Sequence, residues 1–216
     1  DQTFLLHSKA TILFNLKMFK EAIPVYTRLI DIKSRPDYKD YQKLGICYYY
    51  KNKLKLADLK LKESYKRDSS QSLTSYYLGV TNLELNNLAV ADRYLNRTLD
   101  LSTPSFLGEI YFHLASLDVR KKSFRQAINN YKAALKYSSD KPEIYYYIAS
   151  IYDKHLVKKD TAVHYYRKYL NSPGEKDKID VLGNYAELRI QRIIEDAFLH
   201  DKKNFREISA SKKESN

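Results

Sequence analysis

Two series of small residues run through the chain with the same period. The first series consists of Ala22, Ala57, Ala91, Ala127 and Ala162. The second consists of Ala10, Gly45, Gly79, Ala115, Ala149 and Gly183. Every spacing within either series lies between 34 and 36 residues. Two interleaved series with one period indicate a tandem repeat, so the unit of about 35 residues constrains the fold more than any other feature.

Each repeat has room for two helices and two turns. Four positions after each member of the first series stands a large residue: Tyr26, Leu61, Leu95, Tyr131 or Tyr166. Residues four apart share a helix face, so the small residue lets a neighbouring helix approach and the large one fills the space beside it. The 216 residues include only 5 Gly and 5 Pro, too few for the turns of a β-rich protein. We therefore predict an all-α fold.

The repeats resemble the tetratricopeptide repeat family. Leu44 to Tyr48 reads LGICY, Ile148 to Tyr152 reads IASIY, and Ala127 to Tyr131 follows A-x-x-x-Y. These match the family's L-G-x-x-Y and A-x-x-x-F patterns. The family's tryptophan position never holds Trp, and Asp118 stands where Tyr is usual. One extra residue enters the turn of the fifth repeat, around 155–160.

The resemblance implies an α-solenoid of five helix-turn-helix repeats followed by a capping helix. We place the repeats at 1–36, 37–70, 71–104, 105–140 and 141–174, the capping helix at 175–200 and a charged, flexible tail at 201–216. The capping helix is expected to bury Leu182, Tyr185, Ile190, Ile193, Ile194 and Phe198. Its solvent face is expected to carry Glu187, Arg189, Arg192 and Glu195.

In this family the first helix of each repeat lines a concave groove. The resemblance thus implies a partner-binding groove formed by Lys43, Tyr49, Tyr76, Tyr77, Phe112, His113, Tyr146 and Tyr147. Tyrosine brings a large contact area and a polar tip at low entropic cost. An alternative is that these aromatic residues only stack on one another along the solenoid. Tyr48 and Tyr152 occupy the family's structural tyrosine position and are expected to pack between helices.

The excess of basic residues is concentrated in the second repeat. The chain has 38 Lys and Arg against 26 Asp and Glu, a net charge of +12. Four lysines recur at helical spacing: Lys51, Lys55, Lys62 and Lys66. In the family geometry this stripe lies on the outer wall, away from the groove. It is either a solvated face or a patch that docks an acidic partner.

No catalytic constellation is apparent. The sequence has no H-E-x-x-H, no Gly-rich phosphate loop and no G-x-S-x-G, and its five histidines lack ligand spacing. The single cysteine, Cys47, is expected to be a small buried residue rather than a nucleophile. We therefore expect no catalytic, metal-binding or cofactor-binding residues, no cofactor and no enzyme activity.

The leading functional hypothesis is a protein-protein interaction scaffold that holds an extended peptide or a partner helix in the tyrosine-rich groove. One alternative is a regulatory or localising arm of a larger envelope or signalling protein, since the sequence begins at Asp1 rather than Met. A second is a basic solenoid that binds nucleic acid, the least favoured partner class. No apolar run is long enough to span a bilayer.

Partner identity, oligomeric state and compartment do not follow from the sequence. The bias toward Lys, Tyr and Asn favours a bacterial source. A periplasmic or envelope location is favoured over the cytoplasm.

Overall fold

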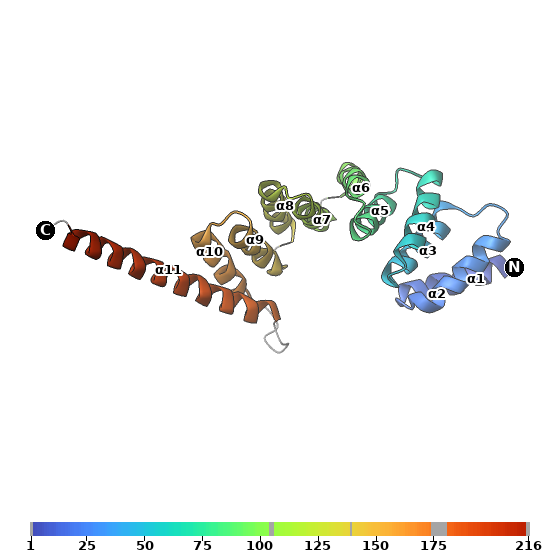
Figure 1. Cartoon of the computed structure of the whole chain (residues 1–216). Coiled ribbons are helices and arrows are strands. Elements are labelled where there is room, and N and C mark those ends of the chain that lie inside the picture. Colours follow the sequence, from blue (N-terminus) through green and yellow to red (C-terminus); the bar gives the residue numbers. More distant parts are fainter. Residues whose placement is uncertain (1, 104–105, 139, 174–180, 215–216) are drawn as a thin grey trace. The chain divides into compact units, whose positions relative to one another are not determined.

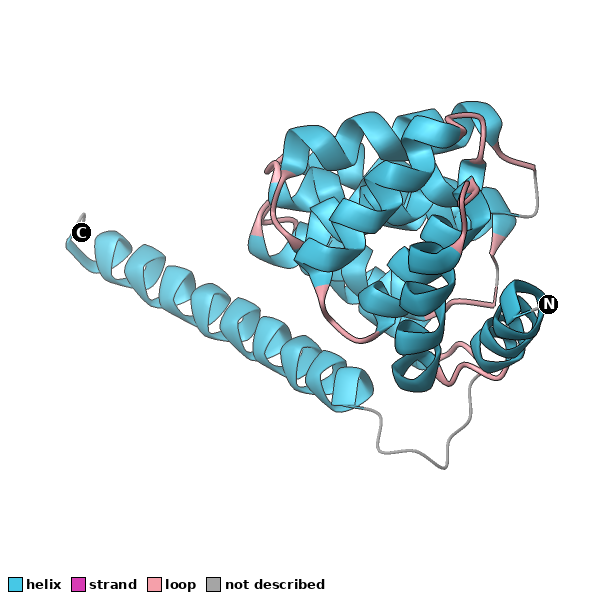
Figure 2. Cartoon of the chain, turned by 90° about the vertical axis from the view of Figure 1, so that its right-hand side faces the viewer, coloured by secondary structure: helices cyan, strands magenta, loops and turns pink. Residues whose placement is uncertain are grey.

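The computed structural model describes residues 2–103, 106–138, 140–173 and 181–214, with side chains as far as Leu199. Within these ranges every regular element is a helix and none is a strand (Figure 2). The helices are α1 (Gln2–Asn15), α2 (Phe19–Ile32), α3 (Tyr38–Tyr50), α4 (Leu54–Arg67), α5 (Ser72–Glu84), α6 (Leu88–Leu101), α7 (Leu107–Arg120), α8 (Phe124–Tyr137), α9 (Glu143–Lys154), α10 (Lys159–Leu170) and α11 (Val181–Glu214).

The helices form two compact units, Asp1–Tyr137 and Ser138–Asn216. Unit 1 contains α1 to α8, and each helix contacts the next in chain order (Figure 1). The first helices also meet directly, because α5 contacts both α3 and α7. In unit 2, α9 packs on α10, and α11 contacts both. The predicted helical hairpins are therefore present as α1–α2, α3–α4, α5–α6, α7–α8 and α9–α10.

The two series of small residues form the contacts between paired helices. All the alanines of both series are fully buried, and so are the large residues that follow the first series. A Cβ atom built on Gly45 would lie 2.6 Å from Leu61 Cγ, and one on Gly79 would lie 2.8 Å from Leu95 Cγ. Both distances are too short for a real carbon contact. Glycine is therefore required where the facing residue is leucine.

The type of the large residue depends on the type of the small residue that it faces. In the two repeats where the small residue is Gly, the large one is Leu, as in Gly45 with Leu61. In the other three repeats the small residue is Ala and the large one is Tyr, as in Ala10 with Tyr26. A leucine branches at Cγ, close to its own backbone, whereas a tyrosine ring is flat. The chain thus uses two solutions to the same packing problem.

Each hairpin turns through one residue in the left-handed region: Lys17, Asn52, Asn86, Lys122 or Val157. In the first four repeats it follows the second-series residue by seven positions, and in the fifth by eight. The extra residue predicted in the fifth turn is thus confirmed. Valine is poorly suited to a positive φ, so Val157 marks the inserted turn as locally strained.

A buried carboxylate attaches α11 to the last repeat. Asp153 of α9 accepts hydrogen bonds from Arg189 Nε at 2.7 Å and Arg189 Nη2 at 2.8 Å. Lys159 Nζ donates to the same carboxylate at 2.6 Å, and the Tyr166 hydroxyl donates at 3.4 Å. The placement of Arg189 on the solvent face was therefore wrong. A bidentate Arg pair in this geometry is among the stronger polar contacts available to a protein.

The pKa of Asp153 predicts an acid-sensitive attachment of α11. Burial alone would raise this pKa, but the hydrogen bonds from Arg189 and Lys159 lower it from 3.8 to about 2. A lowered pKa means that the stabilisation is complete above the unfolded value and is lost as pH falls from about 4 to about 2. We expect the Asp153→Asn variant to lack this pH-dependent part of the folding stability. The difference in urea midpoint between wild type and variant, measured against pH, should shrink across that window.

The capping helix differs from the prediction in length and contacts. Its backbone continues to Glu214, through most of the segment predicted to be a flexible tail, because neither Gly nor Pro occurs after Gly183. Ile193 is buried, but Tyr185, Ile194 and Phe198 are exposed. Ala197 lies beside Asp160 in the first turn of α10, so α11 passes the end of α10 there. Residues 1, 104–105, 139, 174–180 and 215–216 of the predicted segments lie outside the described residues, and so do the side chains of the predicted tail.

Candidate interaction surface

A continuous series of ring contacts crosses the first-helix face of unit 1. We call it the aromatic row, and its members are Phe19, Tyr49, Tyr50, Tyr77, Tyr76, Phe106, His113, Phe112 and Tyr131. Successive ring centroids along the row lie 4.6 to 5.8 Å apart. Most of these pairs are edge-to-face, the arrangement that the charge distribution of aromatic rings favours. The row draws on α2, α3, α5, α7 and α8 and on the residue preceding α7.

The accessible end of the row is formed by Tyr50. Its side chain is 53% exposed, and its ring stacks on Phe19 at 4.6 Å with an interplanar angle of 5°. Its hydroxyl lies 3.0 Å from the hydroxyl of Tyr77. Tyr49 and Tyr77, both predicted groove residues, are half-buried beneath it with centroids 5.4 Å apart. This end combines an exposed apolar ring with paired hydroxyls.

The middle of the row is part of the core. Tyr76 is only 8% exposed, and its ring packs against Phe106 and His113. Its hydroxyl donates to Glu109 Oε1 at 3.4 Å. The prediction placed Tyr76 on an open groove, but α5 is covered on both sides by α3 and α7. For the same reason Val80 and Leu83, at neighbouring inward positions of α5, are buried.

The far end of the row lies on α7. His113 and Phe112 are half-buried, and the Phe112 ring meets Tyr131 of α8 at 5.8 Å. His113 Nε2 lies 3.5 Å from Glu109 Oε1, which would form an ion pair if the imidazole were protonated. Both predicted groove residues therefore remain at a partly accessible position.

Lys43 lies beside the row rather than within it. Its Nζ donates to Thr11 Oγ1 of α1 at 3.4 Å and lies 5.6 Å from the centroid of the Phe14 ring. Burial lowers the pKa of Lys43, with the nearby Lys39 acting in the same direction. Lys43 thus links α1 to α3 and places a positive charge beside the aromatic residues.

Burial affects the acidity of three tyrosines of the row. It raises the pKa of Tyr49, Tyr76 and Tyr77 above the ordinary tyrosine value, and neighbouring acidic groups such as Glu109 add to the effect. Their hydroxyls are neutral at physiological pH, as tyrosine hydroxyls ordinarily are, and can both donate and accept hydrogen bonds.

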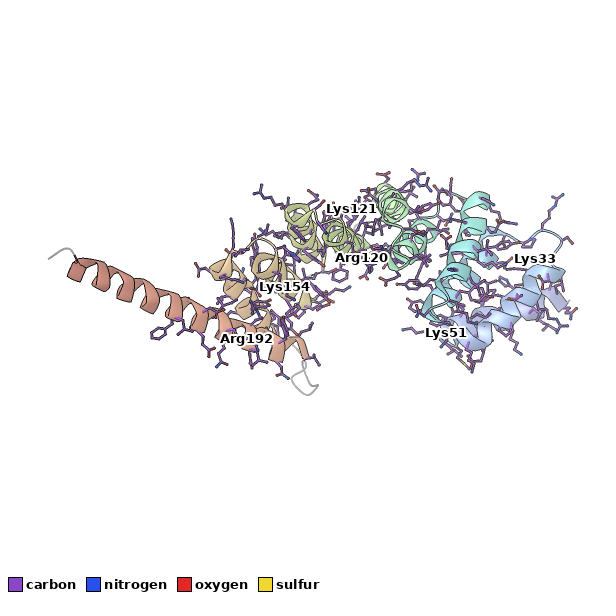
Figure 3. The ribbon with its side chains drawn as sticks, in the orientation of Figure 1. Lys33, Lys51, Arg120, Lys121, Lys154 and Arg192 are labelled. Atoms are coloured by element: carbon purple, nitrogen blue, oxygen red, sulfur yellow. The ribbon has the colours of Figure 1, made fainter. Side chains whose placement is uncertain are left out.

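Two residues of this surface escaped the prediction. Tyr50 and Arg120 are each the last residue of a first helix, five positions after the small residue of the repeat. The predicted groove residues ended at Tyr49 in the second repeat and at His113 in the fourth. Arg120 donates to the Leu83 carbonyl oxygen and lies 3.3 Å from Glu84 Oε1, joining α7 to the end of α5 (Figure 3). Following each first helix to its last residue would have found both.

Unit 2 has an aromatic cluster of its own. Tyr146 lies at its centre, within 5.7 to 6.1 Å of the rings of Tyr147, Tyr166, Tyr169 and Tyr185. Burial raises the pKa of Tyr146. Tyr146 and Tyr147 were predicted to share one groove with the tyrosines of α3 and α5. In the structure they belong to the aromatic cluster of unit 2.

The predicted lysine stripe lies largely on α4. Lys62 pairs with Asp58 at 2.6 Å, and Lys66 pairs with Glu63 at 2.9 Å. Lys55 is exposed, and Lys51 lies at the C-terminal end of α3 (Figure 3). The acidic residues of α4 thus pair with basic residues in the second half of the helix only.

The structure offers little for bond-making chemistry. Cys47 is fully buried, and burial raises the pKa of its thiol to about 12, so the reactive thiolate is disfavoured. Across the described ranges, no group of three or more His, Cys, Asp or Glu side chains is placed to hold a metal ion. In the same part of the chain, no helix combines the length and apolar character needed to cross a membrane.

Two family models match the chain, one for a tetratricopeptide repeat over residues 5–36 and one for a TPR repeat over 115–155. MamA from Desulfovibrio magneticus RS-1, from its residue 41 to its end, has a TM-score of 0.71 at 14% identity, over 79% of this chain and 94% of that one. A second MamA crystal structure has a TM-score of 0.69 at 21% identity, over 78% and 90%.

The Cut9–Hcn1 hetero-tetramer of the APC/C has a TM-score of 0.68 at 20% identity, over 85% of this chain and 34% of that one. At these identities the likenesses concern the fold. The search of curated proteins found no match.

Proposed function

We propose that the chain is a tetratricopeptide repeat protein that serves as a non-catalytic scaffold and holds an extended peptide or a partner helix on the aromatic row of unit 1. The repeats themselves support a protein-interaction scaffold. The finer assignment to the aromatic row rests on one observation: Tyr50 is about half exposed, and its ring meets the half-buried rings of Tyr49 and Tyr77 edge to face.

Contact with a partner would bury the exposed part of this ring. Phe19 holds the Tyr50 ring from below, so little conformational entropy remains to be lost on binding. An apolar partner side chain set against an aromatic anchor of this kind contributes on the order of 2 kcal/mol. The paired hydroxyls of Tyr50 and Tyr77 then offer hydrogen bonds to the partner backbone and fix its register.

The surrounding charges are mixed. Glu84 is exposed and paired with Arg120, and Lys43 lies at the α1 side. A partner therefore meets both signs of charge near the aromatic anchor. Mixed charges of this kind favour specificity over non-selective attraction.

A random peptide library displayed on phage tests the assignment. Peptides are selected on the wild-type chain. Their affinity for it is then compared with their affinity for a variant that carries Tyr50→Ser and Tyr77→Phe. The first change removes the exposed ring, and the second removes one hydroxyl while keeping the core packing. We expect the selected peptides to lose roughly 30-fold in affinity, measured by fluorescence polarisation.

The matched control is Tyr137→Ser. Tyr137 is exposed to a similar degree and stacks on Tyr111, but it lies at the end of α8, outside the aromatic row. Peptides should bind this control as they bind wild type. The aromatic row is not the binding surface if the peptides bind the Tyr50/Tyr77 variant as tightly as wild type. The same conclusion follows if Tyr137→Ser lowers peptide affinity as much as the Tyr50/Tyr77 variant does.

A further inference from the structure

Two leucines stand exposed on the outer face of α4. Leu56 is 41% exposed and Leu59 is 51% exposed. They occupy the positions one before and two after the repeat alanine. The corresponding pairs in the other second helices are Glu21 and Pro24, Val90 and Arg93, Gln126 and Asn129, and Thr161 and His164. Only α4 has an aliphatic residue at both positions, so the repeat fold does not require this pair.

Unpaired lysines surround the two leucines. Residues 51–67 contain seven Lys and Arg and two acidic residues. Both acidic residues already pair with basic ones, Asp58 with Lys62 and Glu63 with Lys66 and Arg67. Within the part of the chain that the structure describes, no ion pair involves Lys51, Lys53, Lys55 or Lys60.

We propose that this face, consisting of Leu56, Leu59, Lys55 and Lys60 of α4 with Lys51 and Lys53 of the turn before it, docks unit 1 on the surface of an anionic lipid bilayer. The leucines enter the boundary between headgroups and acyl chains. The lysine stems lie along that boundary while their ammonium groups reach the lipid phosphates. The helix lies in the plane of the interface and does not cross it.

Composition favours lipid over a protein partner. The cores of protein interfaces are enriched in Tyr, Trp, Phe, Met and Arg and depleted in Lys. The face of α4 differs, since the exposed residues of the helix are two leucines, two lysines and Arg67, and Arg67 is already paired with Glu63. The one aromatic residue of α4, Tyr65, is half-buried and packs on Tyr94 of α6. Leucine and lysine together on one helix face are typical of peripheral membrane helices.

The proposal is independent of the aromatic row. α4 is the second helix of its hairpin, whereas Tyr49 and Tyr50 lie on the first. Docking through α4 would thus hold the protein on a membrane and leave the aromatic row available.

Vesicle flotation with the full chain tests the proposal. The probes are vesicles of phosphatidylcholine alone and vesicles of phosphatidylcholine mixed with phosphatidylglycerol. We expect wild type to float with the anionic vesicles only, and less so as salt is raised. A Lys51→Gln and Lys55→Gln variant should lose roughly 20-fold in partition, because each lysine near an anionic surface contributes about fivefold. A Leu56→Ser and Leu59→Ser variant should lose several-fold.

Two controls separate this face from the net charge and from general hydrophobicity. Lys132→Gln with Lys136→Gln removes the same charge from the exposed side of α8, and Leu73→Ser removes an equally exposed leucine from α5. Both should partition like wild type, and circular dichroism should show that all variants keep their helices.

Four results would overturn the proposal. The first is an absence of binding to anionic vesicles at low salt. The second is an equal loss in the α8 control and the Lys51/Lys55 variant, which would mean attraction by net charge. The third is unchanged partition of the leucine variant, which would mean that α4 does not enter the bilayer. Binding to polyglutamate without binding to vesicles would assign the face to an acidic protein and would overturn it as well.

Discussion

Replacing Asp153 by alanine is expected to release α11 from the last repeat. The carboxylate is fully buried and holds Arg189 through two hydrogen bonds and Lys159 through one. Removing one partner of a buried ion pair costs about 3 to 5 kcal/mol. The side chains of Arg189 and Lys159 are partly exposed, so water can hydrate their charges once the carboxylate is gone. The lower end of that range therefore applies.

Hydrogen exchange measures this effect where it arises. A repeat fold can open locally at its end, so the loss should appear as faster amide exchange over residues 181–199 rather than in the whole chain. About 3 kcal/mol corresponds to roughly 150-fold. Asp100→Ala removes an exposed carboxylate from α6 in unit 1 and serves as the control. Unchanged exchange in α11 of the Asp153 variant would show that apolar contacts such as Ile193 hold the helix alone.

The family and the fold could be predicted because the repeat imposes the same physical problem five times. Ala22, Ala57 and their equivalents recur wherever two helices must approach closely, and every one of them is buried. A single occurrence would have been ambiguous. The pattern LGICY of residues 44–48 carries meaning only because similar segments recur in phase along the chain.

The polar details could not be predicted in the same way. Arg189 and Asp153 lie 36 residues apart, and helical periodicity alone places Arg189 on the charged face of α11. Its pairing depends on how α11 packs across α9, which no local pattern encodes. The prediction for Tyr76 was wrong for a related reason. The inward positions of a first helix are open at the end of a stack, but they are covered where other helices flank both sides.

The division of roles among the tyrosines follows from the same geometry. Tyr26 and Tyr166 fill the space beside an alanine and are fully buried, whereas Tyr50 lies at the end of a helix and is exposed. One residue type thus supplies both the packing and the candidate contact surface. Position within the repeat, rather than residue type, decides between the two.

Replacing Leu61 by alanine is expected to destabilise unit 1 by about 3 kcal/mol. Leu61 is fully buried against Gly45, and truncation of a buried leucine costs about 2 to 5 kcal/mol through lost contacts and the cavity that remains. Urea denaturation followed by circular dichroism measures the change. Leu59→Ala, two positions away on the same helix but exposed, is the matched control and should cost less than about 1 kcal/mol.

The Gly–Leu pairing makes a sharper prediction. In wild type, Gly45→Ala should destabilise, because its Cβ would lie 2.6 Å from Leu61 Cγ and 3.1 Å from the Leu61 backbone nitrogen. Alanine is otherwise the better helix former by about 1 kcal/mol. Combining Gly45→Ala with Leu61→Tyr recreates the Ala–Tyr pair found at Ala10 and Tyr26. The double variant should be more stable than either single one, and additive losses would mean that the two pairings are not interchangeable solutions.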